Sequence, residues 1–73
     1  MNRIPVESSN LKSVGYDPES ETLEIQFRAN DRVYQYYEIP QVVFNGLMAM
    51  KDKGFYLKHV IGNAYDYKEI KNE

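Results

Sequence analysis

The sequence contains no cysteine, and its 73 residues include a single histidine, His59. Without cysteine the chain forms neither a disulfide nor a thiolate metal site, and one imidazole is too few for a structural zinc site. A chain of this length is one small domain near the lower limit of independent folding. Its stability must come from packing, and 42% of its residues are hydrophobic, including seven tyrosines and three phenylalanines.

The sequence also lacks a strong excess of either charge and lacks long hydrophobic runs. The net charge is −2 and the isoelectric point is about 5.3, whereas domains that bind phosphate backbones are often basic, with values above about 9. The opening MNRIPVESSN has no apolar core of a signal peptide, and no apolar run approaches the roughly 20 residues that span a bilayer. We therefore expect a cytoplasmic protein without a membrane segment.

Alternation of apolar and polar residues predicts three antiparallel strands after an N-terminal arm at residues 1–10. Strands are expected at about 11–17, 22–28 and 32–39. The first should place Val14 and Tyr16 on one face and Leu11 and Ser13 on the other. Turns are predicted at DPES, where aspartate and proline favour a type I turn, and at Ala29-Asn30-Asp31.

The loop between the second and third strands decides which tyrosines face the core. A loop of two or four residues places Tyr34 and Tyr36 on the face that carries Phe27, whereas a loop of three residues would bury Gln35 instead. A slip of one residue exchanges whole faces, so burying the amide is costly. We therefore expect the even loop, with Tyr34 and Tyr36 in the core and Tyr37 on the opposite face.

Helical patterns follow Pro40, which suits the first turn of a helix because its missing N–H costs nothing there. Two short helices are expected at about 41–51 and 55–61, with Gly46 marking close packing and Gly54 ending the first helix. The end of the chain is predicted as a short fourth strand near Tyr65 and Tyr67 or as an extended tail, with a charged tail at 68–73. Strands followed by helices predict an α+β domain over 11–67, with both helices on one sheet face.

Three stretches together resemble the KTSC domain: SSNLKSVGYDPESETLEIQF, VYQYYEIP and KGFYLKHVIGNAYDY. The central Y-x-Y of that family matches Tyr34 and Tyr36, and its following V-P step matches Ile39-Pro40. Its glycine-aromatic step matches Gly54-Phe55-Tyr56, and a late tyrosine matches Tyr65. The resemblance covers about residues 8–67.

The resemblance implies the fold more than the function. This small module occurs alone in bacteria and phages and at the C-terminus of some lysyl-tRNA synthetases, an association that implies RNA binding. The family's A-x-S-x-G-x-Y/F pattern is altered in this chain, which reads AMKDKGF over 49–55. Any role of the family's serine hydroxyl is therefore not carried over.

Two surfaces are candidates for recognising a partner. The first comprises Lys51, Lys53, Phe55, Tyr56 and Lys58, where lysines next to aromatic residues could grip a phosphate backbone and stack a base. The alternative is that the rings pack while the lysines are solvated. The second surface comprises Tyr37 and Arg32.

The sequence contains few features that are typical of an enzyme or of a cofactor-binding protein. No phosphate loop, dinucleotide fingerprint or metal-binding motif is present, and the serines lie in the first third without a nucleophile elbow. The acidic residues 17–24 lack the ligand ladder and glycine of a calcium loop. We expect no enzyme activity, no cofactor and no metal.

The expected function is therefore that of a small non-enzymatic binding module of bacterial or phage origin. A protein partner is favoured narrowly, because the net charge of −2 opposes a polyanion and tyrosine is enriched at interface hot spots. RNA, including a tRNA-like molecule, is the alternative.

Overall fold

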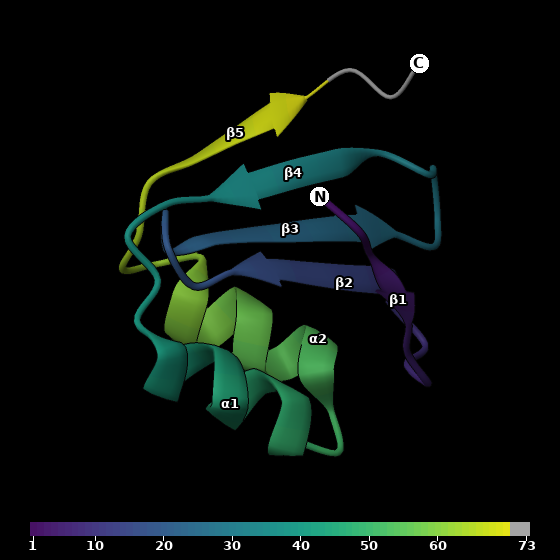
Figure 1. Ribbon diagram of the computed structural model, residues 1–73. Coiled ribbons are helices and arrows are strands. Elements are labelled where there is room, and N and C mark those ends of the chain that lie inside the picture. Colours follow the sequence, from purple (N-terminus) through teal and green to yellow (C-terminus); the bar gives the residue numbers. More distant parts are fainter. Residues whose placement is uncertain (71–73) are drawn as a thin grey trace.

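The computed structural model describes residues 1–70 and shows a five-stranded antiparallel sheet with helices on one face (Figure 1). The strands lie in the order β1-β2-β3-β4-β5. The elements are β1 (Ile4–Pro5), β2 (Leu11–Asp17), β3 (Thr22–Phe27), β4 (Val33–Tyr36), α1 (Gln41–Ala49), α2 (Lys53–Tyr56), the π-helical turn η1 (Leu57–Ile61) and β5 (Tyr67–Ile70). The predicted α+β class is confirmed, with two more strands than the three that the alternation indicated.

The β3–β4 hairpin has the even loop that the sequence favoured. Phe27 N–H donates to the Arg32 carbonyl at 2.9 Å, which closes a loop over residues 28–31, and Asp31 takes the left-handed φ of 58°. Tyr34 lies opposite Ile25 and Tyr36 opposite Leu23. Both tyrosines therefore share the face on which the helices pack.

The predicted face of Leu11 is wrong, because β2 contains a bulge. The register shifts between Leu11 and Ser13, so that Leu11 pairs with Phe27 and Ser13 with Gln26. The extra residue, Lys12, returns Leu11 to the face of Val14, and both side chains are fully buried in the core.

The third strand is shorter than predicted and ends at Tyr36 rather than near residue 39. Glu38 has a φ of 57°, a left-handed conformation that breaks an extended strand. The chain then turns so that Ile39 N–H donates to the Glu21 carbonyl at 2.8 Å. Ile39 is fully buried as a result.

The helix boundaries also differ from the prediction. Helix α1 ends at Ala49, and Asp52 caps α2 by accepting a hydrogen bond from Phe55 N–H at 3.0 Å. Gly54 therefore lies inside α2 and does not end α1, a correction that follows from aspartate being a strong N-cap. Helix α2 continues directly into η1, where Gly62 N–H donates to the Leu57 carbonyl at 2.6 Å.

The core lies between the helices and the β2–β3 half of the sheet. The Tyr16 and Phe44 rings stack at 4.5 Å and join β2 to α1. Gly46 permits close packing, as predicted, because a Cβ there would lie 2.5 Å from the Tyr56 hydroxyl. The buried core residues are Leu11, Val14, Leu23, Ile25, Tyr36, Ile39, Leu47, Leu57 and Ile61.

Both ends of the chain add strands to the sheet. Ile4–Pro5 of the predicted arm pair with β2, and Tyr67–Ile70 pair with β4, so the fourth strand considered for the end of the chain is present as β5. Residues 68–70 of the predicted tail belong to β5, whereas the rest of that tail, 71–73, lies outside the described residues. Within the described part, no helix combines the length and apolar character needed to cross a membrane.

Candidate binding groove

The lysine and aromatic cluster predicted on residues 51–58 is divided in the structure. Tyr56 points inward, and its hydroxyl donates to the Val43 carbonyl at 3.3 Å. Phe55 is 56% exposed and packs against His59, with ring centroids 4.3 Å apart and the ring planes tilted by 39°. Lys53 donates to the Met50 carbonyl at 2.9 Å.

The two remaining lysines of that cluster differ in their surroundings. Lys51 and Lys58 are both exposed, but only Lys58 lines a groove. The predicted patch is thus not one continuous surface.

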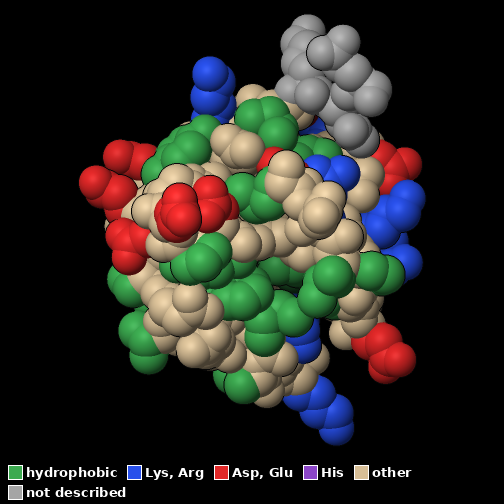
Figure 2. Space-filling view, in the orientation of Figure 1, with side chains coloured by type: hydrophobic (Ala, Val, Ile, Leu, Met, Phe, Trp, Pro, Cys, Tyr) green, Lys and Arg blue, Asp and Glu red, His purple; other side chains and the backbone are tan. Residues whose placement is uncertain are grey.

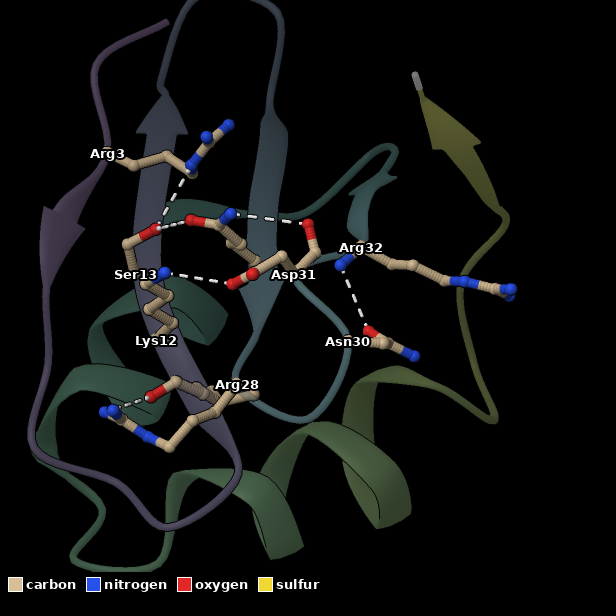
Figure 3. A network of polar contacts seen from close by, with 9 residues as sticks. Arg3, Lys12, Ser13, Arg28, Asn30, Asp31 and Arg32 are labelled. Carbon is tan, nitrogen blue, oxygen red and sulfur yellow. Dashed lines mark hydrogen bonds and ion pairs between the residues drawn. The ribbon is translucent and has the colours of Figure 1, made fainter. Parts of the chain in front are cut away.

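Neither residue of the second predicted surface, Tyr37 or Arg32, is among the described lining residues of this groove. Tyr37 is half-buried on the sheet face turned away from the helices, and its hydroxyl donates to Gln35 Oε1 at 3.1 Å. Arg32 forms an ion pair with Glu69 at 3.7 Å, and its side chain extends away from the neighbouring polar residues (Figure 3).

The same outer face carries a network of polar contacts that extends from Tyr37 to the β3–β4 loop. Gln35 Nε2 donates to Glu24 at 2.9 Å, and Glu24 forms an ion pair with Arg3. Arg3 donates to Ser13 Oγ at 3.2 Å (Figure 3). Glu24 is only 5% exposed, so these bonds satisfy a buried carboxylate and tie the N-terminal segment to the sheet.

A groove with a volume of about 800 Å³ lies on the helical face, between the β3–β4–β5 side of the sheet and the α2–η1 segment. Its volume falls within the roughly 300–1,000 Å³ of ligand sites. The described lining residues are Ser9, Asn10, Phe27, Arg28, Ala29, Asn30, Tyr34, Tyr36, Gly54, Leu57, Lys58, Gly62, Asn63 and Tyr67. This groove is the candidate functional site, and we call it the aromatic groove.

Aromatic side chains from three neighbouring strands form one side of the groove. Phe27 and Tyr34 meet edge to face at 5.5 Å, and Tyr67 lies 5.8 Å from Tyr34 and 5.4 Å from Tyr36. Tyr36 is 6% exposed, whereas Tyr67, on the edge strand, is 56% exposed. The exposure of the rings therefore increases from the buried Tyr36 to Tyr67 at the open edge.

The tyrosine hydroxyls of the groove remain available for a ligand. Within residues 1–70, the tyrosines that bond to protein through their hydroxyls are Tyr16, Tyr37 and Tyr56. Burial, with smaller effects from Tyr67 and Tyr34, raises the pKa of Tyr36 to about 12. Its phenol, like an ordinary tyrosine, is protonated at neutral pH and can donate a hydrogen bond.

Two cations stand at the groove without carboxylate partners among the described residues. Arg28 is held by the main chain, with Nε 3.1 Å from the Ser8 carbonyl and Nη2 3.3 Å from that of Leu11. The ion pairs in this part of the chain involve Arg3, Lys12 and Arg32, but neither Arg28 nor Lys58.

The nearest acidic side chain in the sheet register is Glu69, which lies opposite Tyr34 and forms an ion pair with Arg32. No aspartate or glutamate occurs among the described lining residues. In Figure 2, acidic side chains gather at the end where β2 leads into β3. The net charge of −2 therefore does not describe the groove, which is locally cationic.

Sequence reasoning located only Lys58 of this groove as a site residue. It assigned Tyr34 and Tyr36 to the core, which is confirmed for Tyr36, while Tyr34 is half-buried against the core. Tyr67 joins them through its pairing with Tyr36. The alternation of β3 and β4 already placed three rings on one face, and that was the signal for the groove.

Comparisons with known proteins agree with this fold. The profile of the KTSC domain matches residues 7–72. The chain belongs to the KTSC domain family. The crystal structure of a KTSC domain protein from Yersinia pestis is similar with a TM-score of 0.89 and 37% identity, over 96% of this chain and 97% of that one.

Two bacterial proteins are similar to this chain over most of its length and most of their own. A protein of Tsukamurella paurometabola is 37% identical over 57 residues, or 78% of this chain and 84% of its own. A protein of Stutzerimonas stutzeri is 35% identical over 60 residues, which are 82% of this chain and 83% of that protein. These names assign no activity.

The departure from the family's serine pattern has a structural counterpart. Counted back from Gly54, the position of the serine in A-x-S-x-G is occupied by Asp52. The Asp52 carboxylate caps α2, and serine and aspartate are both preferred N-caps. A capping role at this position therefore needs no hydroxyl.

Proposed function

We propose that this KTSC domain is a non-enzymatic binding module that recognises a segment of a partner protein in the aromatic groove. The observation that carries the proposal is the meeting of Phe27, Tyr34, Tyr36 and Tyr67 along one open groove. Tyrosine rings supply a large contact area at low conformational cost and are frequent hot spots of protein interfaces.

The position of the groove beside an edge strand favours a protein segment as the partner. Tyr37 N–H donates to the Asp66 carbonyl, and hydrogen-bonded pairs alternate along an antiparallel ladder. The main-chain groups of Tyr67 and Glu69 therefore point away from β4. A partner segment can bond to these groups, as in strand addition, while its side chains reach the groove.

The experiment is an affinity capture from bacterial lysate with three forms of the protein. Tyr67→Ala removes the most exposed ring of the groove, and Val42→Ala, which alters a side chain 73% exposed on α1, is the matched control. The proposal expects a protein retained by the wild type and by Val42→Ala and lost with Tyr67→Ala. A protein retained equally by all three would contradict it.

RNA is a second candidate, because Arg28 and Lys58 stand beside stackable rings. A ¹⁵N-detected titration with bulk tRNA tests it at about 50 and 200 mM salt, a range over which contacts to several phosphates weaken steeply. Salt-sensitive shifts confined to groove residues would support RNA. An unchanged spectrum at low salt would remove it.

A further inference from the structure

We infer that the aromatic groove selects a partner segment with acidic side chains, whose carboxylates pair with Arg28 and Lys58 while an apolar or aromatic side chain packs on the tyrosines. The inference rests on the proposed function and specifies the chemistry of its partner. It is carried by the charges of the groove lining together with the hydroxyls of Tyr34, Tyr36 and Tyr67, which bond to no residue in the described part of the chain.

The guanidinium of Arg28 is preorganised to bind a carboxylate. Its hydrogen bonds to the Ser8 and Leu11 carbonyls use two of the five guanidinium N–H groups and fix the plane of the group. The remaining donors can bind a carboxylate at little further cost in side-chain entropy, and no described carboxylate competes for them.

Lys58 and the phenols complete the complementarity. Lys58 approaches from η1, across the groove from Tyr34 and Tyr36. The Tyr36 hydroxyl is a donor at neutral pH, as a phenol ordinarily is, and anions accept hydrogen bonds from such donors. A basic segment would meet two like charges, which gives the groove a means of rejecting wrong partners.

An acidic protein segment fits these charges better than a nucleic acid does. A segment with two carboxylates matches the two cations of the groove, whereas a nucleic acid strand adds a negative charge with every nucleotide. Beyond the groove the strand would meet a protein of net charge −2. The edge strand adds main-chain groups that favour an extended peptide.

The test is a selection of short random peptides displayed on phage against the whole chain, followed by binding measurements on synthetic copies of the enriched peptides. The inference expects enrichment of aspartate and glutamate beside an apolar or aromatic residue. Replacing those acidic residues by their amides should weaken binding about tenfold or more, since each loses a charge-assisted hydrogen bond.

Variants of the chain locate the contact. Lys58→Gln should weaken the binding of an acidic peptide about two- to fivefold, the range for one partly exposed charge pair. Arg28→Lys should weaken binding further, because lysine lacks the planar guanidinium that can hold a carboxylate with two hydrogen bonds. Lys51→Gln, an exposed lysine outside the described groove lining, is the matched control and should change nothing. If Arg28→Lys disturbs the loops that Arg28 holds, the binding measured with Lys58→Gln still tests the inference.

Each remaining outcome overturns the inference in a distinguishable way. Enriched peptides without acidic residues that still require Tyr67 would keep the groove as the binding surface and refute only its acidic preference. Peptides that bind Tyr67→Ala and Lys58→Gln as well as wild type, or no enrichment at all, would refute the proposed function too. Displacement of an acidic peptide by a uridine-rich oligonucleotide that binds more tightly would assign the groove to nucleic acid.

Discussion

Removing the guanidinium of Arg3 should destabilise the fold more than its place near the start of the chain implies. Arg3 Nη1 pairs with Glu24 Oε2 at 2.5 Å, where the side chains are 22% and 6% exposed. Arg3→Met keeps the methylene stem that packs near Gly15 and deletes only the charge and its hydrogen bonds. Among residues 1–70, the Glu24 carboxylate would then keep only the hydrogen bond from Gln35.

Arg3→Met should lower the free energy of unfolding by about 2 kcal/mol. An unsatisfied buried polar group costs roughly 1–3 kcal/mol, and breaking a fully buried ion pair costs about 3–5. The lower range applies because Arg3 is partly exposed and water can replace it. Against a total stability of roughly 4–11 kcal/mol for a chain of this size, the melting temperature should fall by about 8–16 °C.

Urea and thermal unfolding of two further variants complete the measurement. Arg32→Met removes an exposed pair whose nitrogen and oxygen are 3.7 Å apart, and it should cost less than about 0.5 kcal/mol. Adding Glu24→Gln to Arg3→Met should restore at least half of the loss, because no buried charge remains. An Arg3→Met variant no less stable than Arg32→Met would refute this account of the outer face.

Three further changes test other parts of the fold by the same unfolding measurements. Gly46→Ala places a methyl group against Tyr56 and should lower the free energy of unfolding by about 1–3 kcal/mol. Adding Tyr56→Phe should recover part of this loss, and losses that simply add would contradict the contact. Glu38→Gly should stabilise by roughly 0.5–1 kcal/mol, because the φ of 57° is strained for glutamate and not for glycine. The folded-state pKa of Tyr36 is raised to about 12, so its contribution to stability is complete below pH 10 and is lost as the pH rises towards 12. Tyr36→Phe should flatten that alkaline decline, and an unchanged decline would show that Tyr36 is not its source.

Local patterns in the sequence determined the three central strands, the tyrosine faces and the family. Alternation over residues 22–36 and the cost of burying Gln35 were enough to select the even loop, because side-chain direction in a strand has a period of two. Pro40 correctly marked the start of α1, since its constraint on the backbone is local.

Only the tertiary structure decided the features that depend on neighbours distant in sequence. The bulge at Lys12 and the pairing of β1 and β5 are stabilised by contacts with other strands, and the turn at Glu38 is followed by the hydrogen bond from Ile39 N–H to the Glu21 carbonyl. A short window of sequence does not report such contacts. The groove arises in the same way, because it is formed where β5 brings Tyr67 beside Tyr34 and Tyr36. The sequence determined which side chains face which way, and the packing of distant segments determined which of those faces stayed open.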